Sequence, residues 1–183
     1  MAFQNIWYES FLPDKIIEVL EEDLKKFDKD FSTGVTYGGV DLKTRDSRTC
    51  WIPANHWICG MCYHYILSAN KTNFNYDITG FDHDQMQYTS YSEGEYYNWH
   101  VDGGMNSDGE YQRKLSIIVQ LSDPNDYEGG EVQIMNEDGT MQILPKVKGS
   151  VIVFDSRAKH RVRKIYEGNR KSLVGWIVGP RWR

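Results

Sequence analysis

The sequence is poor in cysteine and proline, and it has no long uninterrupted run of apolar residues. Only 3 cysteines and 5 prolines occur in 183 residues. So few cysteines exclude a disulfide scaffold and fit a reducing compartment. No stretch approaches the roughly 20 apolar residues that span a bilayer, and the N-terminal stretch lacks the basic start and apolar centre of a signal peptide. We therefore expect a cytoplasmic protein with no membrane partner.

Positive charge is also scarce. The 21 Lys and Arg residues are outnumbered by 26 Asp and Glu, which gives a net charge of −5. Because binding to phosphate backbones relies on Lys and Arg to displace counterions, nucleic acid is not expected as a partner. The length suits one domain, over residues 1–183, that folds without needing a metal for its stability. Any metal site is therefore interpreted as functional, and the sequence does not fix the oligomeric state.

Aromatic residues are plentiful, and the chain changes character near residue 70. Apolar residues recur at helical spacing in residues 13–27 and 53–68, which predicts two early helices. After them, short apolar runs alternate with clusters of Gly, Asp and Asn at intervals of about 8 to 12 residues, as in an antiparallel sandwich or barrel. We expect an α+β, mainly β fold in which residues 1–85 give helical and loop support and residues 86–180 form the barrel core.

Cys59 and Cys62 form a CxxC pair, which raises the question of a zinc or redox site. There is no second CxxC, and the pair falls within a predicted helix. A zinc or redox site of this kind needs more ligands or another context. Simple burial is the favoured interpretation.

A candidate metal site comes from two histidines and one aspartate. His100 and Asp102 stand two residues apart in the stretch NWHVDGG, and this spacing on a strand puts both side chains on one face. His160, after the strand-like stretch GSVIVFD, supplies a third ligand. Two histidines and one carboxylate with open coordination positions are typical of non-haem Fe(II) oxygenases. We interpret His100, Asp102 and His160 as metal-binding and catalytic residues.

A candidate anion site lies nearby. Arg170 comes ten residues after His160, across the turn EGN, so the chain can return it to the same barrel on a neighbouring strand. A guanidinium inside an apolar barrel calls for an anion, and the distal carboxylate of 2-oxoglutarate is the one expected. Gln120 shares a strand face with Ser116 and Ile118. Its amide either binds the cosubstrate carboxylate or is simply buried or exposed.

The stretch from Tyr91 to Asp102 resembles the Y-x-x-G-x-x-Y-x-x-H-x-D signature of prolyl 4-hydroxylases, within the Fe(II)/2-oxoglutarate dioxygenases. Residues 128–131 resemble the E-G-G-E turn of the same family, and the likeness covers about residues 86 to 179. It implies a double-stranded β-helix core of the jelly-roll or cupin type with the N-terminal helices packed on it. It also implies that Tyr91 and Arg170 bind the cosubstrate.

The reaction implied by this resemblance uses Fe(II), 2-oxoglutarate and O2, and it gives succinate, CO2 and a hydroxylated substrate. Ascorbate is a further cofactor of such enzymes. Peptidyl proline is the expected substrate, held by Trp176, Arg45 and Tyr97. Arg170 stands where collagen-type relatives commonly have Lys, which leaves the subfamily open. The alternatives are another residue, a free amino acid or a small molecule as substrate, or a metal-binding barrel without catalysis, which the presence of both Tyr91 and Arg170 disfavours.

Overall fold

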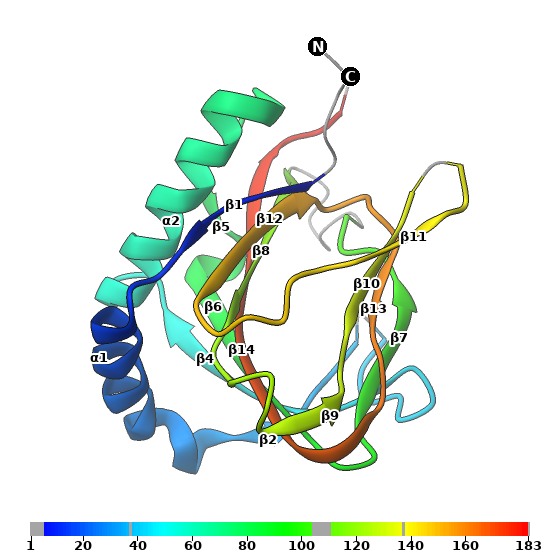
Figure 1. Cartoon of the computed structure of the whole chain (residues 1–183). Coiled ribbons are helices and arrows are strands. Elements are labelled where there is room, and N and C mark those ends of the chain that lie inside the picture. The colour runs from blue at the N-terminus through cyan, green and yellow to red at the C-terminus, as the bar shows by residue number, and fades with distance from the viewer. Residues whose placement is uncertain (1–5, 37, 104–110, 137, 183) are drawn as a thin grey trace.

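The computed structural model describes residues 6–36, 38–103, 111–136 and 138–182. Two antiparallel sheets face each other, and the two longest helices cover the outer face of the larger sheet (Figure 1). This arrangement confirms the mainly β fold and the double-stranded β-helix expected from the sequence. No helix in the described part of the chain is long and apolar enough to cross a bilayer.

The helical segments are α1 (Asp14–Leu24), η1 (Lys25–Asp30), α2 (Trp57–Ala69), η2 (Asn70–Phe74) and η3 (Asp82–Asp84). The larger sheet contains β1 (Ile6–Phe11), β12 (Ser150–Asp155), β8 (Tyr111–Gln120), β14 (Ile165–Pro180), β6 (Gln85–Ser92), β4 (Arg48–Pro53) and β2 (Ser32–Thr33) in this order, with β5 (Gly80–Phe81) and β9 (Tyr127–Gly129) also pairing with β14. The smaller sheet runs in the order β11 (Met141–Ile143), β10 (Val132–Met135), β13 (His160–Val162), β7 (Tyr96–His100) and β3 (Arg45–Asp46).

Both predicted helices are present. In α1 the buried residues are Ile17, Leu20 and Leu24, at the spacing that gives a helix one apolar face. In α2 the buried face includes Cys59 and Cys62, and both thiols are free. The CxxC pair is therefore buried in the core between α2 and the larger sheet, as the sequence favoured.

Alternating side chains divide the larger sheet into two faces with different roles. Along β8, Leu115, Ile117 and Val119 belong to the core under the helices, whereas Ile118 belongs to the core between the sheets. Ser116 and Gln120 share the face of Ile118, because side chains two apart on a strand point the same way. Polar groups therefore enter the barrel from this strand.

The N-terminal 85 residues contribute more strands than the one short strand that we expected among the loops of residues 34–53, and these strands join both sheets. β1 lies at one edge of the larger sheet and pairs with β12. β4 lies between β2 and β6, in the segment where the loops and the short strand were expected. Strand pairing uses backbone groups that every residue other than proline carries in full. A short polar strand near a sheet edge therefore leaves little trace in composition.

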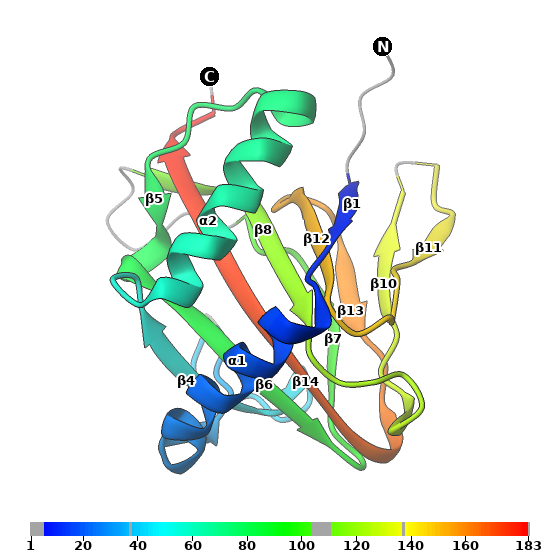
Figure 2. The same cartoon turned by 60° about the vertical axis from the view of Figure 1, so that its left-hand side comes forward.

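β14 is the longest strand, with 16 residues, and it runs along the larger sheet from one end to the other (Figure 2). It pairs with β8 on one side and with β6 on the other. It carries Arg170 and Trp176, the two C-terminal residues singled out in the sequence. β14 therefore places Arg170, the predicted cosubstrate-binding residue, and Trp176 on one strand in the middle of the larger sheet.

Candidate metal centre

His100 and His160 lie opposite each other on two paired strands of the smaller sheet. His100 ends β7, His160 begins β13, and the two residues are direct partners in the ladder. Asp102 follows two residues after His100. The ligand atoms of these three residues all lie within 4.8 Å of one another. The structure therefore brings together all three of the predicted metal ligands.

The spacing of these ligand atoms suits one metal ion. Nε2 of His100 is 3.6 Å from Oδ1 of Asp102, and Nε2 of His160 is 3.5 Å from Oδ2. Ligands at right angles on an ion with bonds of about 2.1 Å, as found for zinc, stand roughly 3 Å apart. A shift of a few tenths of an ångström would close the difference. Two imidazoles and one carboxylate are also the donor set that non-haem iron uses.

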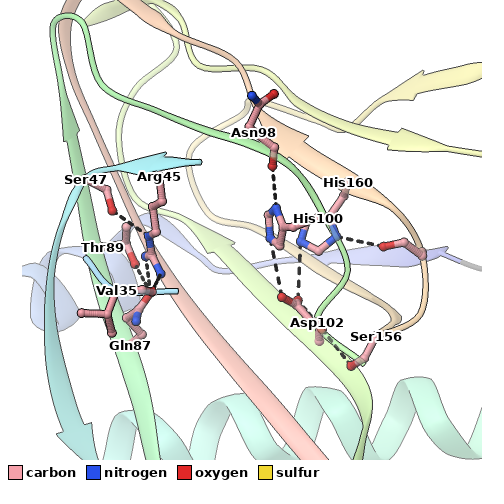
Figure 3. A network of polar contacts seen from close by, with 12 residues as sticks. Val35, Arg45, Ser47, Gln87, Thr89, Asn98, His100, Asp102, Ser156 and His160 are labelled. Carbon is pink, nitrogen blue, oxygen red and sulfur yellow. Dashed lines mark hydrogen bonds and ion pairs between the residues drawn. The ribbon is translucent and has the colours of Figure 1, made fainter. Parts of the chain in front are cut away.

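The imidazole rings are oriented by backbone carbonyls (Figure 3). Nδ1 of His100 lies 2.7 Å from the carbonyl oxygen of Asn98, and Nδ1 of His160 lies 2.9 Å from that of Ala158. A carbonyl oxygen can only accept, so each Nδ1 carries the proton and each Nε2 keeps its lone pair. This arrangement is common for metal-binding histidines. Both free nitrogens face Asp102.

Burial keeps His100 neutral. Its pKa is lowered from the usual 6.5 to about 4, first by burial and then by the neighbouring His160, although Asp102 acts in the opposite direction. A metal ion binds the neutral imidazole only. His100 is therefore ready to bind a cation at neutral pH without first losing a proton.

Asp102 is held by residues that the sequence did not single out as part of the site. Oδ2 of Asp102 accepts a 2.8 Å hydrogen bond from Ser116 Oγ, and Ser116 Oγ lies 2.9 Å from Ser156 Oγ. The backbone N–H of Asp102 donates to the carbonyl oxygen of Ser156. Burial raises the pKa of Asp102, but His160, His100 and Trp176 outweigh burial and lower it. The carboxyl is therefore ionised at neutral pH. The only sequence signal for the role of Ser116 was its predicted inward position on the strand.

Arg170 lies in the barrel with no carboxylate among its contacts in the described residues. It is 1% exposed, and it donates to Gln120 Oε1 at 2.8 Å and to Ser172 Oγ at 3.3 Å. Burial lowers the pKa of its guanidinium, yet arginine stays charged in proteins. The expectation that Arg170 lies on the strand next to that of His160 was wrong, because β14 belongs to the larger sheet and β13 to the smaller. The two strands face each other across the barrel (Figure 1).

Two buried polar atoms at this position, one of them in the guanidinium itself, are unpaired within the described residues. Tyr127 Oη and Arg170 Nε have no hydrogen-bond partner within the described residues. Gly130, with φ of +65°, makes the approach possible, because a Cβ there would lie 3.1 Å from both side chains and 2.4 Å from Ile165. Unpaired buried donors are costly, so a bound anion is the group that this pocket fits. Tyr127 was not among the residues predicted to bind the cosubstrate.

The remaining predicted residues lie around these two clusters. Tyr91 is the ladder partner of Arg170, whose guanidinium lies 5.7 Å from the Tyr91 ring centre. Gln120 is 2% exposed and uses its amide oxygen on Arg170. Trp176 is 7% exposed and has Arg113 over its ring at 4.1 Å. Tyr97 is stacked on His100, and Arg45 contacts Tyr97.

Residues 86–178 match the model of the 2OG-Fe(II) oxygenase superfamily. The chain belongs to this superfamily. Among curated proteins, this oxygenase is 33% identical over 123 residues to a PKHD-type hydroxylase of Cupriavidus metallidurans, covering 63% of this chain and 53% of the relative. It is 41% identical over 85 residues to one of Synechococcus sp. (strain CC9902), covering 46% and 36%. The chain thus spans about half or less of the length of these relatives.

Solved structures share the fold of this oxygenase at low sequence identity. A prolyl-4-hydroxylase of Pseudomonas putida superposes with a TM-score of 0.75 at 20% identity, covering 97% of this chain and 94% of the other. A prolyl hydroxylase of Trichoplax adhaerens, in complex with a hypoxia inducible factor peptide fragment, gives 0.76 at 23% identity, covering 94% and 83%. The likeness extends over nearly the whole chain, including the N-terminal half that the family model does not match.

Proposed function

We propose that this oxygenase hydroxylates proline within a peptide, with iron bound by His100, Asp102 and His160. The observation that carries the proposal is the pairing of two features in one barrel. A compact His-Asp-His cluster supplies the donors that Fe(II) prefers. A buried guanidinium supplies a charge that a dicarboxylate cosubstrate would neutralise.

Each side chain has a distinct task in this proposal. The two histidines and Asp102 would hold Fe(II), and the bound iron would supply the oxidising chemistry that consumes 2-oxoglutarate and O2 and yields succinate and CO2. Arg170 binds the distal carboxylate of 2-oxoglutarate with a charge-assisted hydrogen bond, and Tyr91 lines the same pocket from the neighbouring strand. Gln120 orients Arg170 through its amide oxygen and remains a predicted contact of the cosubstrate.

The substrate assignment rests on the signature from Tyr91 to Asp102 and on relatives that are hydroxylases by name. Structural neighbours with prolyl hydroxylase titles support it. Trp176 remains the predicted substrate contact, because its ring faces the barrel interior next to Asp102. A proline-rich segment is extended before it binds, so its binding costs less ordering entropy than that of a flexible chain.

The test measures succinate formation and a mass gain of 16 Da with three classes of compound. These are proline-rich peptides, the same peptides with each proline replaced by alanine, and free proline. We expect turnover with the first class only, and none in His160→Ala. Equal turnover of the proline-rich and alanine-substituted peptides, or the highest turnover with free proline, would agree with oxygenase activity but reject peptidyl proline as the substrate. Adding ascorbate to parallel reactions tests whether it sustains turnover.

A further inference from the structure

Arg45, Tyr97 and His100 are arranged in layers, with the Tyr97 ring in contact with both of the other side chains. The rings of Tyr97 and His100 are stacked, with centroids 3.5 Å apart and planes 8° apart. The guanidinium carbon of Arg45 lies 4.7 Å from the Tyr97 ring centre. The contact between Arg45 and Tyr97 is expected from the register, because Arg45 on β3 is the direct partner of Tyr97 on β7. The stack of Tyr97 on His100 is not expected from a regular strand.

A bulge in β7 makes the stack possible. Tyr97 and His100 are three residues apart, so on a regular strand they would point to opposite faces. Their partners on β13 are Val162 and His160, only two residues apart, so β7 contains one extra residue at this point. Such a bulge re-aims a side chain, and bulges are frequent next to active sites. Here it turns Tyr97 onto the face of His100.

Arg45 is fixed in place by neutral groups (Figure 3). It is 4% exposed. Its Nε donates to Ser47 Oγ at 2.8 Å, and its terminal nitrogens donate to the Val35 carbonyl oxygen at 3.1 Å and to Gln87 Oε1 at 2.7 Å. No carboxylate pairs with it in the described residues. A cation with its hydrogen bonds satisfied but its charge unpaired interacts favourably with the face of an aromatic ring.

Gly34 makes room for this cation. A Cβ at Gly34 would lie 2.4 Å from Ser47 Oγ and 2.8 Å from Arg45 Nε. The backbone N–H of Gly34 also donates to the carbonyl oxygen of Ser47. Gly34→Ala would therefore displace Arg45 without changing any charge.

The two histidines differ in what surrounds them. The side chain of His160 is 6% exposed, and Phe154 lies edge-on to its ring at 4.9 Å. The side chain of His100 is 13% exposed, and Tyr97 is the ring stacked on it. The carbonyl of Asn98 fixes one ring nitrogen of His100 but not the rotation of the ring about that hydrogen bond. A stacked neighbour fixes this remaining freedom.

We infer that Arg45 and Tyr97 are positioning residues that fix the plane of the His100 ring for metal binding. The inference rests on the proposed function, and it assigns these two residues a task other than the predicted contact with substrate. The guanidinium holds the tyrosine ring, and the tyrosine ring holds the imidazole.

The test compares Mn(II) dissociation constants, measured by electron paramagnetic resonance of free Mn(II), for the wild type, Tyr97→Leu and Tyr97→Phe. Loss of the ring should weaken Mn(II) binding about ten-fold, the lower range for residues that orient metal ligands. Tyr97→Phe keeps a stacking ring and should bind like the wild type. Tyr88→Leu, a buried tyrosine in the core under the helices, controls for general destabilisation and should leave Mn(II) binding unchanged.

Arg45→Gln tests the order of the contacts. It should weaken Mn(II) binding in the wild-type background and have little further effect in Tyr97→Leu, because the guanidinium acts through the ring. Gly34→Ala should resemble Arg45→Gln. Additive losses, or equal binding by Tyr97→Leu and the wild type, would overturn the inference. So would a Tyr97→Phe variant as weak as Tyr97→Leu, because the hydroxyl and not the ring would then matter.

Ring-current shifts in the wild type test the stack even if Tyr97→Leu fails to fold. The His100 ring protons should be shifted upfield by the Tyr97 face in the metal-free protein, and unshifted resonances would contradict the stack. A wild type that does not bind Mn(II) would instead overturn the proposed function. A raised KM for peptide with unchanged Mn(II) binding in Arg45→Gln and Tyr97→Leu would show substrate contact in place of positioning.

Discussion

Ser116 in the larger sheet donates its hydroxyl to Asp102, which extends from the smaller sheet, at 2.8 Å. This hydrogen bond links the two sheets at the metal centre. It occupies Oδ2, the same oxygen that faces His160. The orientation of the one carboxylate ligand therefore depends on a strand that supplies no ligand itself.

Ser116→Ala should weaken Mn(II) binding by about ten- to a hundred-fold, the range found for partners of metal ligands. The reason is that Asp102 loses the donor that fixes its rotation. Ser150→Ala is the matched control, since the Ser150 hydroxyl is equally buried but unpaired within the described residues. Calorimetric titration of the metal-free variants gives both constants, and equal affinities would show that Ser116 does not orient the ligand.

Arg170→Ala should raise the dissociation constant of 2-oxoglutarate and leave that of Mn(II) nearly unchanged. A charge-assisted hydrogen bond of this kind contributes roughly 1.5 to 3 kcal/mol. The Mn(II)-loaded protein is titrated with 2-oxoglutarate and with 2-oxobutyrate, which lacks the distal carboxylate. The substitution should affect the first ligand only. A similar loss for both ligands would place the contact elsewhere.

Tyr127→Phe should leave the free energy of unfolding of the ligand-free protein unchanged or higher, because the lost hydroxyl has no partner in the described residues. The same substitution should weaken 2-oxoglutarate binding, since burial raises the pKa of Tyr127 and keeps its hydroxyl a donor beside Arg170. Tyr76→Phe is the contrast: it removes a 2.6 Å hydrogen bond to Asp155 and should lower the unfolding free energy by about 1 to 3 kcal/mol. Urea unfolding measures both, and equal losses would contradict the assignment.

Asp155 should make stability depend on pH in the acid range. Burial raises its pKa, but hydrogen bonds from Arg157 and Tyr76 outweigh burial, so its pKa lies below the ordinary value of 3.8. A carboxyl with a lowered pKa stabilises the folded state above its unfolded pKa, and this contribution disappears as the pH falls through the folded pKa. Asp155→Asn should therefore cost most near neutral pH and progressively less below about pH 4. Urea midpoints of the metal-free proteins check this, and a constant gap would argue against it.

Two parts of the site, the pair of His100 and Asp102 and the polar inner face of β8, could be predicted because both follow from local spacing, whereas His160 reaches them only through the pairing of β13 with β7. The spacing of His100 and Asp102 and the alternation of Ser116 and Gln120 require only that a strand have a period of two. Both helices were also predicted, since each buries residues at helical spacing. Such patterns do not depend on which strand pairs with which.

Features that arise from pairing between distant segments could not be predicted in this way. The bulge that turns Tyr97 toward His100 exists only because β13 opposes β7 with one residue fewer. β1 gains its place at the sheet edge from β12, more than a hundred residues later in the chain. Tyr127 approaches Arg170 through a pair of glycines whose conformations, at φ of +81° and +65°, are set by the chain packed against them.

β14 has no bulge between Arg170 and Trp176, so an inserted or deleted residue in this segment would change which side chains face the barrel. The two residues are six apart, and Ser172 and Val174 lie between them on the same inner face. One inserted or deleted residue within this segment would exchange inward and outward side chains beyond that point. Leu173 and Ile177, now under the helices, would trade places with the inward set. An insertion or deletion between Arg170 and Trp176 would therefore disturb the side chains near Asp102 as well as the pocket for the cosubstrate anion.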